Sequence, residues 1–100
     1  MNTFTMTFEQ FSSVMLAAGY DQVTTRVWDA NIKLDEHTHP FDANAIVVQG
    51  DMVLGVEGRE PIKLAAGDTF HLKANTPHYE EYGSQGATFW VARKGEIPAT

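Results

Sequence analysis

The sequence predicts an all-β domain, an antiparallel sandwich or barrel, with one short helix in front of it. Stretches that alternate apolar and polar residues recur from Gln22 onward, separated by turn residues roughly every 8–12 positions, a spacing typical of small β sandwiches and barrels. No helical pattern lies between these stretches, so parallel strands joined by helices are not expected. A length of 100 residues allows one core. We therefore expect an N-terminal segment of residues 1–21, one β domain of residues 22–93 and a frayed tail of residues 94–100.

The helix is expected over residues 8–18. Thr7 is a suitable N-cap, and Gln10 three positions later completes a capping-box pattern. Gly19 follows as a natural C-terminal stop, because glycine tolerates a positive φ. One face carries an apolar stripe formed by Phe8, Phe11, Met15 and Ala18. Such a short helix is unstable alone, so we expect the stripe to pack on the rest of the protein.

The strands are expected where apolar residues alternate with polar ones or form short runs. These segments are residues 23–27, 32–34, 45–48, 52–56, 62–64, 70–72 and 88–91, with a further one that starts at His78. Gly50-Asp51 is interpreted as the turn that ends one strand, and the stretch from Gly83 to Gly86 as a turn that leads into the last strand.

The charge balance argues against two classes of partner. Lys and Arg number 7 and Asp and Glu number 13, so the formal net charge is −6 with neutral histidines. An acidic chain without a basic run is a poor match for nucleic acid or an anionic membrane surface. No segment reaches the roughly 20 apolar residues of a membrane helix, and residues 1–7 lack the features of a secretory signal. We therefore expect a soluble cytoplasmic protein.

The chain has no cysteine, which excludes a disulfide scaffold, a thiolate metal site and a cysteine nucleophile. Of its 4 histidines, two form the pattern His37-Thr38-His39. In an extended segment, residues two apart point to the same side. Two imidazoles placed in this way can chelate one metal ion, such as Zn, Cu, Fe or Ni.

Two segments resemble the two sequence motifs of the cupin superfamily. The first motif begins with HTHPFDA at residues 37–43 and extends to Gly50. The second reads GDTFHL over residues 67–72 and ends in Pro77-His78.

The resemblance covers about residues 32–92. It implies a small antiparallel double-stranded β-helix, or jelly-roll barrel, with the two histidine-bearing segments facing each other across its mouth. It also implies one divalent metal ion, Fe, Zn, Mn or Ni, and a small-molecule ligand or substrate. The metal ligands that it implies are His37, His39 and His78.

One position of the first motif departs from the family's pattern. The family usually has a glutamate ligand a few residues after the second histidine, and Ala43 stands there. Asp42 is adjacent, but residues 37, 39 and 43 share a parity that Asp42 lacks, so its carboxylate should face the other way. In the second motif, Lys73 replaces a usual proline and Asn75 a usual glycine, although asparagine tolerates the left-handed conformation. Three neutral imidazoles would leave the charge of a divalent ion uncompensated and favour an anionic ligand.

Glu80 and Tyr82 share the parity of His78, so both are candidate catalytic residues in the same cavity. Glu80 could replace the missing carboxylate as a ligand or act as a general base. The simpler interpretation is that the strand has bent outward by this point, with Glu80 and Glu81 as a solvated pair. His71 stands between Phe70 and Leu72, so it should point outward if those two fill the barrel, and Tyr79 should face away from His78.

Several apolar residues are expected as core or as pocket lining, namely Phe41, Met52, Leu54, Val56, Phe89 and Val91. Trp28 and Trp90 are expected on the outer face of the sheet or at a dimer contact. A barrel of this size leaves apolar surface and edge strands to cover, and the resemblance implies a homodimer.

The function is open between classes, because one fold hosts many functions. The first is a metal-dependent enzyme on a small oxygenated or anionic organic molecule, acting as a dioxygenase, isomerase or lyase. The second is a non-catalytic small-ligand-binding or sensing module without metal, in which the histidines serve as hydrogen-bonding groups of the pocket. The third is a structural relic without a ligand.

Overall fold

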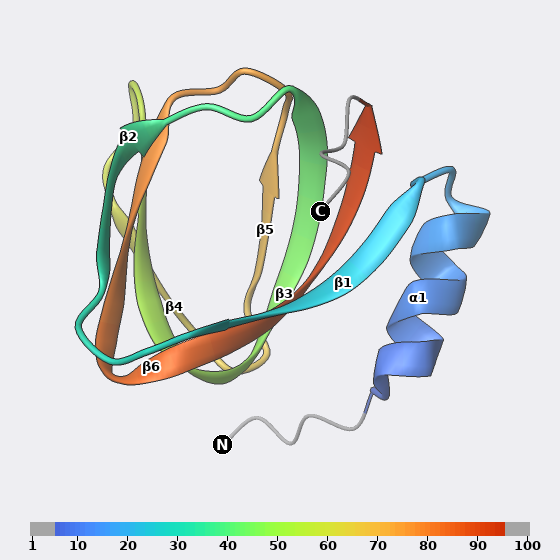
Figure 1. The fold of residues 1–100 in the computed structure, drawn as a ribbon, viewed down its shortest axis with the longest axis horizontal. Coiled ribbons are helices and arrows are strands. Elements are labelled where there is room, and N and C mark those ends of the chain that lie inside the picture. The colour runs from blue at the N-terminus through green and yellow to red at the C-terminus, as the bar shows by residue number, and fades with distance from the viewer. Residues whose placement is uncertain (1–5, 96–100) are drawn as a thin grey trace.

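A computed structural model describes residues 6–95 of the chain. One helix, α1 (Phe8–Ala17), lies outside a six-stranded antiparallel sheet that curls into a barrel (Figure 1). The strands are β1 (Gln22–Trp28), β2 (Lys33–His37), β3 (Phe41–Val56), β4 (Ile62–Ala65), β5 (Thr69–Leu72) and β6 (His78–Gly95). The predicted all-β class, a small antiparallel barrel with a short helix in front, is confirmed.

The long strands β3 and β6 form the frame of the barrel. They pair with each other along their length, from Phe41 opposite Gly95 to Val56 opposite His78. β1 and β5 extend one half of this pair, and β2 and β4 extend the other half. Each long strand therefore belongs to both sides of the barrel, as in a jelly roll.

The two glycine-rich stretches interpreted as turns are bends within continuous strands, so that interpretation was wrong. The register of β3 and β6 shifts on both sides of Gly50, which has a φ of +75°. A Cβ atom on Gly50 would lie 2.0 Å from the carbonyl oxygen of Gly86. The close approach of two backbones needs a residue without a side chain, and the irregularity bends the strands instead of ending them.

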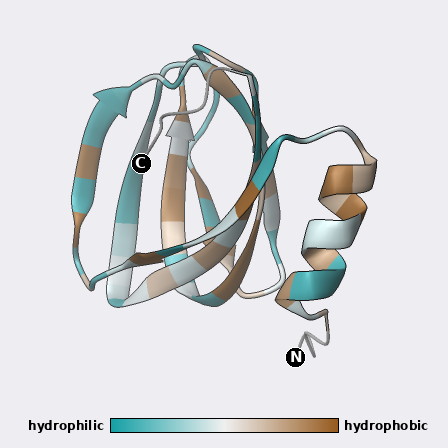
Figure 2. Cartoon of the chain, turned by 45° about the vertical axis from the view of Figure 1, so that its right-hand side comes forward, coloured by the Kyte–Doolittle hydropathy of each residue, from teal (hydrophilic) through white to brown (hydrophobic). Residues whose placement is uncertain are grey.

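The bend also changes which residues face the interior. In β3 the side chains of the barrel core have odd numbers before Gly50 and even numbers after it, whereas buried Ile46 packs under the helix. In β6 the interior side chains have even numbers up to Tyr82 and odd numbers from Ala87 on, whereas buried Ala92 packs under the helix. The resulting core consists of Phe41, Ala43, Ala45, Val47, Met52, Leu54, Leu64, Leu72, Tyr82, Ala87, Phe89 and Val91. Figure 2 shows hydrophobic and hydrophilic residues following one another along the strands.

The helix has the caps that the sequence predicts. The Thr7 hydroxyl accepts a hydrogen bond from the backbone N–H of Gln10, whose side chain accepts one from the N–H of Thr7. The helix ends one residue before the expected boundary, and Gly19 follows with a φ of +100°. Phe11 is buried against Trp90, with their ring centroids 5.9 Å apart. The helix thus covers the outer face of the sheet, where Trp90 was expected.

The alternating apolar residues of β1 lie on the outer side of the barrel, although such a pattern usually marks the inner face. Val23 packs under the helix, and Val27 is 71 % exposed. The even-numbered residues Arg26 and Trp28 therefore face the interior. The expectation of an outer-face Trp28 was wrong, because its ring lies inside the barrel and stacks on Tyr82 with centroids 5.3 Å apart.

The C-terminal end of the described chain is paired. Lys94 and Gly95 lie opposite Asp42 and Phe41, so this part of the expected frayed tail belongs to β6. The remainder of that tail, residues 96–100, lies outside the described residues. Within residues 6–95, no helix has the length and hydropathy to cross a membrane.

Candidate metal centre

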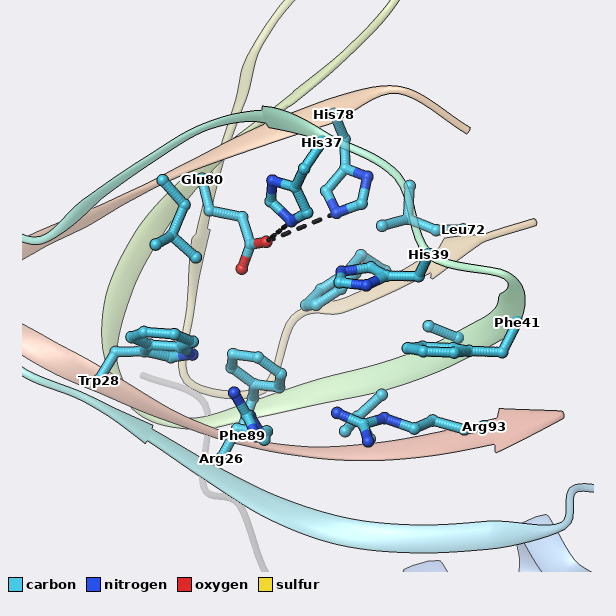
Figure 3. A pocket seen from close by; sticks show the side chains of 14 residues that line it. Arg26, Trp28, His37, His39, Phe41, Leu72, His78, Glu80, Phe89 and Arg93 are labelled. Atoms are coloured by element: carbon cyan, nitrogen blue, oxygen red, sulfur yellow. Dashed lines mark ion pairs between the residues drawn. The ribbon is translucent and has the colours of Figure 1, made fainter. Parts of the chain in front are cut away.

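Three histidines and one glutamate converge at one end of the barrel (Figure 3). β2 ends at His37, which pairs directly with His78 at the start of β6. His39 follows in the connection to β3, and Glu80 projects from β6 two residues after His78. The pairing of β2 with β6 therefore joins the two motifs that the sequence keeps apart.

The distances within this His/Glu group are those of a compact cluster. Glu80 Oε2 lies 3.2 Å from His37 Nε2 and 3.5 Å from His78 Nε2. The imidazole centroids of His37 and His78 are 4.4 Å apart, and that of His39 is 4.8 Å from His37. One potential ligand atom from each of the four residues lies within 4.8 Å of the others.

Two of the histidines are oriented by the backbone. Nδ1–H of His37 donates to the carbonyl oxygen of Asp35 at 2.7 Å, and Nδ1–H of His78 donates to that of Thr76 at 2.9 Å. In the neutral imidazole this donation leaves the lone pair on Nε2, whereas in the protonated ring Nε2–H can donate to the Glu80 carboxylate. Both Nε2 atoms face Glu80. Donation of Nδ1–H to a backbone carbonyl is also how metal-binding histidines are commonly oriented.

Glu80 points inward, so the solvated-pair interpretation was wrong. Its residue is only 8 % exposed, and one carboxylate oxygen accepts a hydrogen bond from the Tyr82 hydroxyl. This bond uses Oε1, while Oε2 faces the histidines. The β2–β6 pairing continues to Leu34 opposite Glu80, which keeps this part of β6 within the barrel wall.

The charges within the cluster displace several pKa values. Burial opposes ionisation of Glu80, but the hydrogen bonds from His78 and Tyr82 outweigh it and hold its pKa below 4.5. Burial likewise opposes protonation of His78, yet its bonds to Glu80 and to the Thr76 carbonyl raise its pKa above 6.5. Burial and the neighbouring His37 lower the pKa of His39. Burial and the Glu80 charge raise the pKa of Tyr82.

The carboxylate of the cluster comes from β6, and the first motif contributes none. Ala43 is buried in the wall of the cavity beside the cluster. Asp42 faces the other way, as its parity predicts, and its carboxylate accepts a hydrogen bond from the Ala74 N–H at 2.8 Å. Asn75 follows with a φ of +64°, the left-handed conformation expected of it.

Other candidates from the sequence lie outside the cavity. His71 is exposed on the outer surface, and Tyr79 packs against Gly55 on the outer side of the barrel, as expected. Tyr82 is interior, but it lies behind Glu80 and Trp28 and does not line the cavity. Its contact with Glu80 gives it the position of a residue that orients the carboxylate.

The cluster opens into a cavity of about 160 Å³. Phe41, Phe89 and Val91 line it, whereas Met52 and Leu54 are core residues away from it. Among the described residues, the wall consists of Arg26, Trp28, Leu34, His37, His39, Phe41, Ala43, Phe70, Leu72, His78, Glu80, Phe89, Val91 and Arg93. The cavity is therefore mainly apolar, with its polar groups gathered in a few places.

Arg26 and Arg93 were not anticipated as cavity residues. Both belong to strands in which the apolar residues at alternate positions are the expected signal for the inner face. In β1 that signal misleads, because Val23 and Val27 are on the outside. In β6, Arg93 continues the inward series of Phe89 and Val91, which a two-residue periodicity could have indicated.

The donor set fits a divalent metal ion. Nitrogen and oxygen ligands bind such ions at about 2.0–2.2 Å, so donor atoms around one ion are at most roughly 4.4 Å apart. The four donor atoms lie within 4.8 Å of one another, slightly more than this limit, so the side chains would have to close in by a few tenths of an ångström around an ion. Imidazole and carboxylate suit Zn, Fe, Mn and Ni, and a chain without cysteine offers no competing thiolate.

Comparison with known sequences identifies the family. The family model described as the cupin domain matches residues 29–92. The chain belongs to the cupin family. The match contains all four residues of the His/Glu group and most of the barrel. No curated protein matches the chain.

Solved cupin structures share the fold of this cupin. The DMSP lyase DddQ from Ruegeria pomeroyi DSS-3 is 20 % identical, with a TM-score of 0.66 over 78 % of this chain and 39 % of the lyase. KdgF from Halomonas sp. is 22 % identical, with a TM-score of 0.66 over 75 % of this chain and 68 % of KdgF. An oxalate oxidase is 18 % identical, with a TM-score of 0.64 over 73 % of this chain and 41 % of the oxidase. The match thus spans about two fifths of the lyase and of the oxidase.

Proposed function

We propose that this cupin holds one divalent metal ion with His37, His39, His78 and Glu80, and binds or transforms a small oxygenated organic molecule in the adjoining cavity. The observation that supports this most is the orientation of the cluster. Backbone carbonyls occupy Nδ1 of two histidines, and their Nε2 atoms converge on one carboxylate oxygen. Similarity to lyases and an oxidase agrees with chemistry on small molecules.

A divalent ion at this centre would polarise a bound carbonyl or acidify a bound water. The protein's own groups prepare the site for this. Tyr82 donates to Glu80 Oε1 and so directs Oε2 toward the histidines. Phe41, Leu72 and Phe89 give the cavity apolar walls that limit access of water to a bound molecule.

Glu80 has two possible roles in such a centre. As a ligand, it supplies the carboxylate that Ala43 cannot. As a general base, it would take a proton from the bound molecule, since its lowered pKa keeps it ionised near neutral pH. The reaction classes that we propose are dioxygenation, isomerisation and lyase chemistry.

Elemental analysis of untagged protein tests the metal proposal. We expect about one Fe, Zn, Mn or Ni per chain, or uptake of one on addition, and a loss of about tenfold or more in affinity for His39→Ala, which removes a ligand. His71→Ala is the matched control, because this histidine is exposed outside the site. Less than about a tenth of a metal per chain, without uptake, would contradict the proposal.

Catalysis is tested separately. The metal-loaded protein is assayed for oxygen consumption and for product formation with 1,3-dicarbonyl, catechol and sugar-like compounds. Turnover that disappears in His39→Ala and persists in His71→Ala supports an enzyme.

One observation favours a second candidate, a small-ligand-binding module without metal. Glu80 already pairs with His37 and His78, so the cluster has internal partners in the absence of an ion. Ligand-induced thermal stabilisation of chelator-treated protein, without turnover, would distinguish this module from the metal-dependent enzyme.

A further inference from the structure

Two guanidinium groups lie across the cavity from the His/Glu group (Figure 3). In the β1–β6 pair, Arg26 lies opposite Phe89, and Arg93 lies on the same inward face four residues further along β6. Both side chains line the cavity, and their charges are close enough that Arg26, after burial, lowers the pKa of Arg93. The positive charges of Arg26 and Arg93 thus lie near each other in one wall of the cavity.

Within the described part of the chain, no carboxylate neutralises either guanidinium, since none forms an ion pair with Arg26 or Arg93. Arg93 Nη1 donates to the Gln22 side chain at 3.3 Å, while Arg93 Nε is buried without a hydrogen-bond partner in this part of the chain. The indole Nε1 of Trp28, in the same wall, is also buried without one. Unsatisfied donors of this kind are uncommon in proteins and call for a partner.

Aromatic rings hold the two guanidiniums in place. Arg26 Cζ lies 5.3 Å from the centroid of the Trp28 ring, and Arg93 Cζ lies 4.9 Å from that of Phe41. Contact with an aromatic face leaves the N–H edges of a guanidinium available for hydrogen bonds. The fork of N–H groups on such an edge matches the two oxygens of a carboxylate.

The distribution of charge gives the cavity two distinct ends. Among the described residues, Glu80 is the only acidic one in the cavity wall, and it is engaged with His37 and His78. The end formed by Arg26 and Arg93 therefore carries positive charge that no carboxylate of residues 6–95 pairs with, in a protein whose net charge is −6. An anionic group would be attracted to this end and repelled by Glu80.

We propose that Arg26 and Arg93 form a carboxylate-binding subsite, so that the ligand of this cavity is a small organic carboxylate. Its carboxylate would lie between the two guanidiniums and offer an acceptor to Arg93 Nε. A second oxygen function, such as a hydroxyl or keto group, would extend toward the His/Glu group; this part rests on the proposed metal centre. A cavity of about 160 Å³ accommodates a molecule close to the size of benzene. The ligand class is therefore a small hydroxy or keto acid.

The test uses benzoate and its neutral isostere benzamide as probes, with chelator-treated full-length protein and calorimetric titration. We expect benzoate to bind at least about tenfold more tightly than benzamide, because only benzoate pairs with guanidinium. Arg26→Gln and Arg93→Gln should each weaken benzoate binding about tenfold or more and leave benzamide unchanged. Lys94→Gln removes one positive charge from an exposed side chain of the same strand and should leave both affinities unchanged.

Other outcomes separate this inference from the metal proposal. Equal affinity for the two probes, or benzoate binding that ignores both arginine variants, overturns the carboxylate subsite, whatever the metal content. Benzoate binding that depends on both arginines in a protein that takes up no metal supports the subsite and contradicts the metal proposal alone. Arg26 is exposed, so Arg26→Gln keeps the test informative even where Arg93→Gln does not fold.

Discussion

Glu80 is a buried carboxylate that keeps its charge through the groups around it. Moving an ionised carboxylate out of water is costly unless hydrogen bonds and opposite charges compensate. Tyr82 donates to one oxygen, and His37 and His78 lie beside the other. The same arrangement leaves His78 easier to protonate and Glu80 harder to protonate than in water. The response of the cluster to pH therefore comes from the protonation of these two residues, His78 and Glu80.

We predict a defined pH dependence for the metal-free protein. The pKa of His78 is raised above 6.5, so its stabilising contribution is complete below pH 6.5 and is lost as pH rises through the raised value. The pKa of Glu80 is lowered below 4.5, so its contribution is complete above pH 4.5 and is lost as pH falls through the lowered value. The pair should thus stabilise the fold most between pH 4.5 and 6.5.

Urea denaturation of the wild type and Glu80→Gln across pH measures this contribution. The difference in free energy of unfolding should be largest in that window and decrease at higher pH. NMR titration should show the His78 midpoint moving to lower pH in Glu80→Gln, because the carboxylate that raises it is gone. The pKa of His39 is lowered, so its protonation in acid destabilises the folded state in both the wild type and Glu80→Gln. A pH-independent difference would contradict the assigned coupling.

At the scale of elements, the bends of β3 and β6 decide what faces the cavity. Without the register shifts around Gly50, the inward parity of β3 would continue unchanged through its second half. The matching change in β6 allows Glu80 and Phe89, of opposite parity, to face one interior. The helix has a separate role, since it covers Trp90 on the outer face.

Gly50→Ala should be strongly destabilising. Its Cβ would lie 2.0 Å from the Gly86 carbonyl oxygen, and its φ of +75° adds strain for a residue with a side chain. We expect a loss of about 3 kcal/mol or more in free energy of unfolding by urea denaturation. Gly58→Ala is the control: its φ is +81°, but no atom of residues 6–95 outside its own neighbours lies within 4 Å of the added atom. It should cost about 1–2 kcal/mol, from the backbone alone. Equal losses for the two variants would show that backbone packing at the bend is not limiting.

At the scale of the whole molecule, the His/Glu group lies where three segments of the chain meet. Apart from this group, strand pairing is what joins these segments. His37 ends β2, His39 lies ahead of β3, and His78 and Glu80 begin β6. An ion bound by all four would hold one end of the barrel closed. The homodimer and the cytoplasmic location inferred from the sequence stay predictions.

Metal binding should therefore raise the thermal stability of the protein. At a free metal concentration of about 100 times Kd, binding to the native state alone adds about 2.7 kcal/mol. For a domain of this size that corresponds to a rise of roughly 10–20 °C in Tm. Differential scanning calorimetry with added Zn²⁺ and then with chelator measures the rise and its reversal. His71→Ala should show the same rise and His39→Ala little of it; a Tm independent of metal would argue against a centre that spans these segments.

The sequence by itself determined the fold class, the capped helix and the identity of the histidines that meet. Thr7, Gln10 and Gly19 act locally, and local chemistry can be inferred from neighbouring residues. The His37-Thr38-His39 pattern and the second motif around His78 can likewise be recognised, because each lies within one short segment of the sequence.

Only the tertiary structure decided the position of Glu80, the inward face of β1 and the presence of two arginines in the cavity. The face of a strand depends on which side another element covers, and α1 covers the side of β1 that carries Val23. The course of a strand through a bend depends on a close contact between distant backbones, here Gly50 with Gly86. These are long-range packing effects, so an alternating pattern in one segment cannot fix which side becomes the interior.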